Sequence, residues 1–161
     1  MNKFHPLKIN TRNLTWDNNE PRSLDHDDRF FQPNVIDETS EVFIKANNLI
    51  DRWTKNNLNN FKIAELGFGF GLNFLITAKY WYQHNQNNKK WLDYVSIDCF
   101  PLNINDFKEV IANYPELEEF SDVFIEHFPF ECNGFTRIEI PKFRIRLTLI
   151  VNDIEKLSLI H

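Results

Sequence analysis

The fold is decided by the stretch FKIAELGFGFGLNF, residues 61–74. The 161-residue chain has four glycines, and Gly67, Gly69 and Gly71 fall within five residues. This concentration predicts backbone that only glycine tolerates, with positive φ or close approach of another group. The apolar run 61–66 is typical of a buried parallel strand, and residues 72–84 are long enough for a helix. A Rossmann-like sheet presents nucleotide-type ligands through this strand, turn and helix order.

The spacing of the turn favours one class of ligand. Dinucleotide proteins use G-x-G-x-x-G, whereas this chain has G-x-G-x-G with Glu65 two residues before the first glycine. A carboxylate there would repel a pyrophosphate, but it suits the sulfonium and ammonium groups of S-adenosylmethionine. The E-x-G-x-G-x-G form resembles the first motif of class I methyltransferases. A nicotinamide dehydrogenase is the weaker alternative, and a tight turn without any ligand is another.

A second strand points to the same kind of site. Residues 91–97 read as a strand that ends in Asp98. In dinucleotide proteins an acid at the end of the second strand binds the ribose hydroxyls, and adenosine carries the same ribose. The alternative for Asp98 is a helix N-cap or a turn acid.

Composition limits the function classes. The length is that of one domain, and 42% hydrophobic and 15% aromatic residues suffice for a packed core. A net charge of −5 excludes a global basic field for nucleic acid. A local RNA contact would use the basic cluster near the C-terminus, whose alternative is the polar face of a hairpin. This cluster consists of Arg137, Lys142, Arg144 and Arg146.

The cysteines and the hydropathy pattern indicate a compartment. Cys99 and Cys132 lack metal-ligand spacing, so we expect no metal site and read both as free thiols in a reducing environment. We see no signal peptide and no apolar run of membrane length. The sequence therefore predicts a cytoplasmic protein without a membrane partner.

The remaining segments have simpler patterns. Residues 1–36 are polar and rich in proline, which predicts an arm or hairpin anchored by Trp16, Phe30 and Phe31. Residues 37–161 are expected to form the N-terminal portion of a Rossmann-like methyltransferase domain, in which a helix begins after Asp37. Further helices are expected after Asn103 or Asn105 and after Pro115, followed by a hairpin of 136–140 with 143–151. The first helix would bury a stripe of Val42, Phe43, Ala46, Leu49, Ile50 and Trp53.

With these residues in place, the sequence resembles the methyltransferase half of the tRNA 5-methylaminomethyl-2-thiouridine biosynthesis bifunctional proteins. The similarity covers nearly the whole chain in order, and its most specific segments are GFGFGLNF and RIRLTL. The matching segments are PRS (21–23), DDRFF (27–31), ET (38–39), VF (42–43), NNL (47–49), AELGFGFGLNF (64–74), YVSI (94–97), FPL (100–102), GFTR (134–137) and RIRLTL (144–149).

The resemblance implies an activity. The family transfers a methyl group from S-adenosylmethionine to the aminomethyl nitrogen on the wobble uridine of certain tRNAs. In many members a flavin-dependent oxidase half prepares that amine. The implied fold is α/β, that of a class I S-adenosylmethionine-dependent methyltransferase (Rossmann-like), with an N-terminal arm and helix.

The same resemblance implies a set of cofactor-binding residues. Asp98 stands where the family usually has a glutamate on the ribose, and Phe30 stands where a tyrosine is common. Asp153 matches the acid near the adenine, with Asn152 in place of the usual glycine. The residues that line the cofactor loop by position are Glu65, Gly67, Gly69, Gly71 and Asn73.

One part of the family pattern has no counterpart. The family continues into a strand that ends in an Asp-Gly-Phe-Ala-Pro segment thought to carry the catalytic acid, and this sequence contains no such segment. We therefore expect an incomplete sheet and assign no catalytic residue. The favoured hypothesis is a truncated or split tRNA methyltransferase, inactive unless a second polypeptide supplies the remaining strands. The alternatives are a non-catalytic S-adenosylmethionine-binding module and a gene remnant.

Overall fold

The computed structural model describes most of the chain. The described residues are 12–17, 20–24, 28–29, 35–55, 57, 59–87, 89–130 and 132–152. Phe30, Phe31 and Asp153, which the sequence singled out, lie outside them.

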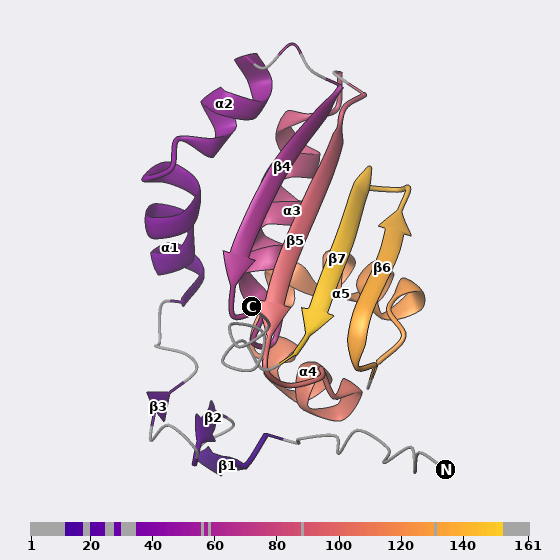
Figure 1. The fold of residues 1–161 in the computed structure, drawn as a ribbon. Coiled ribbons are helices and arrows are strands. Elements are labelled where there is room, and N and C mark those ends of the chain that lie inside the picture. Colours follow the sequence, from indigo (N-terminus) through magenta and orange to yellow (C-terminus); the bar gives the residue numbers. More distant parts are fainter. Residues whose placement is uncertain are drawn as a thin grey trace, which may run out of the picture.

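A four-stranded sheet in the order β4-β5-β7-β6 forms the centre of the molecule (Figure 1). The first three strands are parallel, and β6 runs antiparallel to β7. The structure confirms the glycine-bearing strand, the strand that reaches Asp98 and the C-terminal hairpin. The strands are β4 (Asn60–Leu66), β5 (Trp91–Asp98), β6 (Gly134–Ile140) and β7 (Ile145–Val151).

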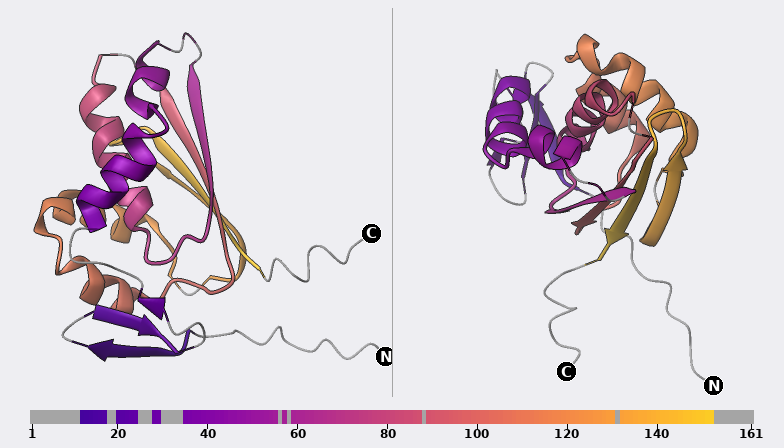
Figure 2. Two further views of the ribbon diagram at one scale, coloured as in Figure 1. Left: turned by 90° about the vertical axis from the view of Figure 1, so that its left-hand side faces the viewer. Right: turned by 90° about the horizontal axis from the view of Figure 1, so that it is seen from above.

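Helices cover one face of this sheet. Seen edge-on in Figure 2, they lie on one side of the strands, which places the core between the two layers. Asn103 caps α4, because its side chain accepts hydrogen bonds from the amides of Asn105 and Asp106 at 2.8 and 3.2 Å. The helices behind the sheet are α3 (Leu72–His84), α4 (Ile104–Ile111), the 3₁₀ turn η2 (Pro115–Leu117) and α5 (Glu118–His127).

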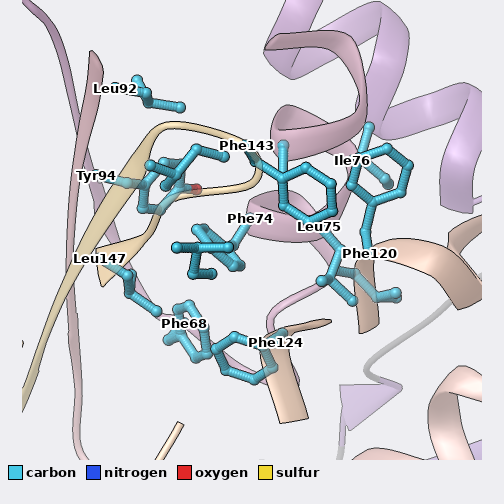
Figure 3. Close-up of a cluster of buried hydrophobic side chains, with 14 of the residues drawn as sticks. Phe68, Phe74, Leu75, Ile76, Leu92, Tyr94, Phe120, Phe124, Phe143 and Leu147 are labelled. Carbon is cyan, nitrogen blue, oxygen red and sulfur yellow. The ribbon is translucent and has the colours of Figure 1, made fainter. Parts of the chain in front are cut away.

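The core between sheet and helices is built on aromatic rings (Figure 3). Phe74 on α3 lies edge-on to Tyr94 of β5, with ring centroids 5.2 Å apart, and 5.6 Å from Phe124 of α5. Phe124 in turn contacts Phe107 of α4 at 5.2 Å. Rings from three helices and one strand therefore meet at one point, which explains much of the chain's high phenylalanine content.

The helical segment before β4 differs from the expectation. It begins at Val35, before Asp37, and consists of α1 (Val35–Thr39), a π-helix η1 (Ser40–Lys45) and α2 (Leu49–Lys55). Asn48 has a φ of 49°, which ends the first helical run and turns the chain before α2.

The expected buried stripe on this segment is wrong in part. Leu49 and Trp53 are buried, but Val42 is 64% exposed and Ala46 is also exposed. A π-helix has a wider repeat than an α-helix, and the turn at Asn48 rotates α2, so a stripe counted at one helical period cannot hold across both.

The N-terminal region forms a small antiparallel sheet. Its strands are β1 (Leu14–Asp17), β2 (Glu20–Ser23) and β3 (Asp28–Arg29), in the order β1-β2-β3. Leu14 and Trp16 pack against the main core. Figures 1 and 2 place this sheet below the ends of the central strands, next to α4.

The other face of the central sheet carries no helix within the described ranges (Figures 1 and 2). Leu66 and Phe135 are 78% and 68% exposed there. The strand β4 pairs only with β5 among the described residues, so its outer edge is unpaired, as expected for an incomplete sheet.

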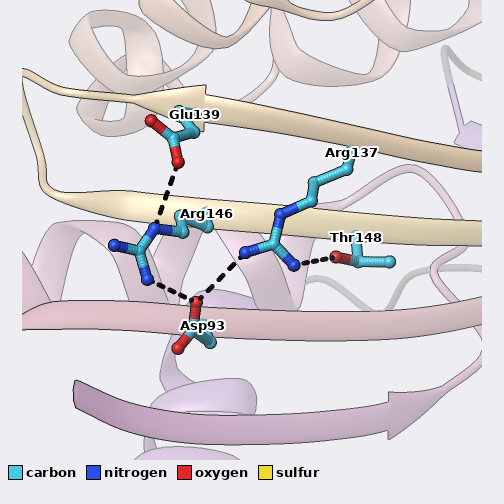
Figure 4. A network of polar contacts seen from close by, with 5 residues as sticks. All are labelled: Asp93, Arg137, Glu139, Arg146 and Thr148. Carbon is cyan, nitrogen blue, oxygen red and sulfur yellow. Dashed lines mark hydrogen bonds and ion pairs between the residues drawn. The ribbon is translucent and has the colours of Figure 1, made fainter.

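A network of charges lies on this open face (Figure 4). Arg146 contacts Asp93 at 3.1 Å and Glu139 at 3.2 Å, and Arg137 lies 3.7 Å from Asp93. Lys142 pairs with Glu119 at 3.0 Å. Three of the four cations in the basic cluster are thus paired with acids, which favours the hairpin-face interpretation over an RNA contact.

Candidate functional site

The glycine turn adopts the backbone that its composition predicts. Gly67, Gly69 and Gly71 have φ angles of 86°, 61° and 75°, all in the left-handed region. The Gly67 amide donates to the carbonyl of Ile97 at 2.7 Å, which ties the turn to the end of β5. A Cβ at Gly71 would lie 3.0 Å from the Phe68 ring, so close packing requires glycine there as well.

Asp98 lies directly beside this turn. Its Oδ2 accepts the Gly69 amide at 2.8 Å, and its Oδ1 accepts the Phe100 amide at 2.9 Å. The second bond is the local turn contact typical of aspartate. Asp98 is buried and does not cap α4, which Asn103 does. The structure therefore brings the acid predicted for the ribose to the carboxyl end of β5, next to the glycine loop.

Glu65 lies at the end of β4 among polar groups from three elements. Asn73 at the start of α3 donates to its Oε2 across 3.5 Å, and the Thr39 hydroxyl on α1 donates to the Asn73 amide oxygen at 3.3 Å. Ser96 is the partner of Glu65 in the β4–β5 register. The other carboxylate oxygen, Oε1, is buried and has no hydrogen-bond partner among the described residues.

Burial raises the pKa of Glu65 from 4.5 to about 7, because removal from water disfavours the charged form. The neighbouring Tyr94, Ser96 and Asn73 side chains offset part of this shift, and the charge of Asp98 adds to it. A carboxylate with an uncompensated oxygen and a pKa near neutrality is a group that a bound cation would stabilise.

One further residue enters this region from the N-terminal segment. The Arg12 guanidinium contacts Asp98 Oδ2 through Nη2 at 2.7 Å. It also lies 5.2 Å from the centre of the Phe70 ring and 5.6 Å from that of Phe100. Sequence reasoning missed Arg12, because nothing in the local pattern links residue 12 to the end of a strand more than eighty residues later.

The predicted residues thus separate into four pairs. Glu65 and Asn73 contact each other, and Gly69 contacts Asp98. Gly67 and Gly71 shape the turn between them. Phe30 and Asp153 lie outside the described residues, as noted above.

Sequence reasoning also overlooked the groups around the Glu65 carboxylate, namely Thr39, Tyr94 and Ser96. A signal existed for two of them. Tyr94, Ser96 and Asp98 alternate along β5, so their side chains point to the same face of the sheet. Thr39 carried no such signal, because its approach depends on how α1 packs against α3.

Comparison with known proteins places this geometry in context. The chain is 37% identical over 150 residues to the tRNA 5-methylaminomethyl-2-thiouridine biosynthesis bifunctional protein MnmC of Legionella pneumophila (strain Corby), which covers 91% of this chain. It is 38% identical over 144 residues to the protein of the same name from Leptospira borgpetersenii, which covers 88%. This chain is homologous to part of the MnmC proteins. It spans 22% of the length of each of these two relatives.

The fold comparison agrees with this homology. The crystal structure of MnmC2 from Aquifex aeolicus matches with a TM-score of 0.60 at 15% identity, and the match covers 97% of this chain and 47% of that one. The chain therefore has the Rossmann-like fold of that protein, with a sheet that is incomplete in the described residues. No family model matches the chain. Within the described ranges, no helix combines the length and apolar character needed to cross a bilayer.

Proposed function

We propose that this chain forms the S-adenosylmethionine-binding part of a cytoplasmic tRNA methyltransferase that acts on the 5-aminomethyl group of the wobble uridine. The names of the MnmC relatives support the tRNA substrate. The observation that carries the cofactor assignment is a buried Glu65 Oε1, without a hydrogen-bond partner among the described residues, at the same strand ends as a left-handed glycine turn and Asp98. In this proposal residues 1–36 form an arm, and residues 37–161 form part of the methyltransferase domain.

The groups at the site fit S-adenosylmethionine. When bound, the cofactor supplies a methyl group on a positively charged sulfur. Glu65, whose Oε1 accepts no hydrogen bond among the described residues, would compensate positive charge on the ligand, and Asn73 donates to its Oε2 across 3.5 Å. The turn from Gly67 to Gly71 would let the ligand approach the backbone, since its Gly67 and Gly69 Cβ positions face open space. Asp98 would accept the ribose hydroxyls. Phe30 and Asp153 stay in the proposed site as residues implied by the resemblance.

We further propose that additional polypeptide completes the sheet, either later in the same protein or as a second chain. The outer edge of β4 borders a groove of about 190 Å³, lined by residues of η1, α2 and β4. Parallel sheets are normally covered on both faces, whereas here one face carries exposed Leu66 and Phe135. The matched Aquifex chain is about twice as long as its matched part. A strand at β4 and helices on the open face would supply the missing cover, and a flavin-dependent half would prepare the amine.

Calorimetric titration of S-adenosylmethionine at pH 8 tests the cofactor assignment. We expect saturable binding by the wild type and at least about tenfold weaker binding by Glu65→Gln, which keeps the shape and removes the charge. The matched control is Glu126→Gln on the exposed side of α5, which should bind as the wild type does. A folded, monodisperse wild type that binds no S-adenosylmethionine would overturn the proposal, and so would full binding by Glu65→Gln.

A further inference from the structure

The N-terminal segment places a cation in the corner where the proposed function needs a nucleoside. Arg12 and Asp98 form an ion pair whose side chains are only 10% and 8% exposed. The Phe70 and Phe100 rings lie beside the guanidinium, at distances typical of cation–π contacts. A flat, delocalised group thus lies among two rings and a carboxylate, where an adenosine would present its own flat base and hydroxyls.

The hydrogen bonds at Asp98 show why the two occupants compete. Its Oδ1 already accepts the Phe100 amide, and its Oδ2 accepts both the Gly69 amide and Arg12. A ribose diol needs free acceptor positions on this carboxylate, and the positions left beside Arg12 are few. Arg12 also adds positive charge to a site proposed to take a cationic ligand.

From these contacts we infer that Arg12 is a built-in occupant of the nucleoside corner formed by Phe70, Phe100 and Asp98, and that an adenosine ligand must displace it. The inference rests on the proposed function, because it names the regulation of the same site. Arg12 lies two residues before β1, and the Leu24 amide donates to the Asn13 carbonyl at 2.9 Å. Displacement of Arg12 would therefore loosen the attachment of the β1–β2 strands to the central sheet.

The competition predicts a gain in affinity when Arg12 is removed. If Arg12 is paired with Asp98 in about 90% of the molecules, the apparent dissociation constant for an adenosine ligand is about tenfold higher than that of the unblocked site. Arg12→Ala should recover that factor. The best probe is 5′-methylthioadenosine, since it contains the nucleoside but neither the sulfonium nor the amino acid part of S-adenosylmethionine.

The experiment combines calorimetry of both ligands with hydrogen exchange. Arg12→Ala should bind 5′-methylthioadenosine and S-adenosylmethionine about tenfold more tightly, and exchange should rise at the amides of residues 14–17, 20, 22 and 23. Adding ligand to the wild type should raise exchange at the same amides. The matched control is Arg52→Ala. It removes a guanidinium on α2 that lies 5.6 Å from the centre of the Phe61 ring of β4, away from this corner, and it should leave affinity unchanged.

The outcomes separate this inference from the proposed function. If wild type and Arg12→Ala bind equally well, or Arg12→Ala binds more weakly, the inference fails while the cofactor assignment stands. If neither protein binds either ligand, the proposed function fails, and the inference that Arg12 blocks a nucleoside site fails with it. A second variant, Arg12→Gln, should show the same gain if Arg12→Ala proves too unstable to titrate.

Discussion

The two faces of the central sheet differ in kind. On the covered face, the rings of Phe74, Tyr94 and Phe124 interlock between the strands and helices. The open face carries the largely exposed side chains of Leu66 and Phe135 and, four residues away along the strands, the ion pair of Asp93 with Arg146. The same strands therefore pack against helices on one side and present exposed apolar side chains and ion pairs on the other. This contrast shows that the covered face stabilises the described part of the chain, while the open face is suited to further polypeptide.

The largest expected effect compares one phenylalanine from each face. Phe74→Ala should lower the free energy of unfolding by about 3–5 kcal/mol, because it leaves a cavity among packed rings. Phe135→Ala, the same change on the open face, should alter it by less than about 0.5 kcal/mol. Urea denaturation followed by circular dichroism measures both. Similar losses of unfolding free energy for the two variants would show that Phe135 is packed as tightly as Phe74, so that the two faces do not differ in packing.

A second prediction concerns how Glu65, at the end of β4, makes the free energy of unfolding depend on pH. The raised pKa of Glu65 means that the folded chain holds a proton that the unfolded chain has lost between pH 4.5 and about 7. Because of Glu65, the free energy of unfolding therefore falls as the pH rises through this window. Above about pH 7 the full loss remains. The shift from 4.5 to about 7 corresponds to about 3 kcal/mol.

Glu65→Gln should remove this dependence. The variant should match the wild type near pH 4.5 and exceed its stability by up to about 3 kcal/mol at pH 8. Urea titrations at a series of pH values measure the difference, with Glu126→Gln as the control for a solvent-facing carboxylate. A constant difference between Glu65→Gln and the wild type across the series would contradict the buried state of Glu65.

The smallest expected effect belongs to the charge network of the open face. Asp93→Asn should lower the free energy of unfolding by about 1 kcal/mol, since its partners Arg137 and Arg146 retain solvent access. Added salt should reduce the loss. Asp51→Asn, which breaks the exposed pair with Lys55 on α2, should cost still less. A loss at Asp93 as large as that of Phe74→Ala would mean that this face is packed and closed.

The sequence predicted the parts of the fold that depend on local pattern. The strand, glycine turn and helix around Gly67, the strand ending at Asp98, and the C-terminal hairpin all follow from spacing, apolar runs and alternation. The place of Asp98 at the end of the second strand follows from the same apolar run. These inferences succeeded because each rests on a period or a turn that a short stretch of chain fixes by itself.

The remaining features depend on contacts between distant segments. The π-helix at 40–45 and the turn at Asn48 rotate the N-terminal helices away from the expected stripe, and no single helical period reveals them. The position of Arg12 beside Asp98 depends on how the β1–β2 strands pack against the sheet. The raised pKa of Glu65 likewise depends on burial by α1 and α3, which the sequence of β4 alone does not contain.

The measurement that most directly tests the central claim is a titration of S-adenosylmethionine followed by amide NMR. The chain has only four glycines, so the resonances of the turn are easily separated. Our account predicts saturable shifts at Gly67, Gly69, Gly71 and Asp98, with the amides of Phe143 and Arg144, in the β6–β7 turn at the opposite end of the sheet, unaffected. Shifts that avoid the turn, or that appear only on the open face, would contradict a cofactor site built on these glycines.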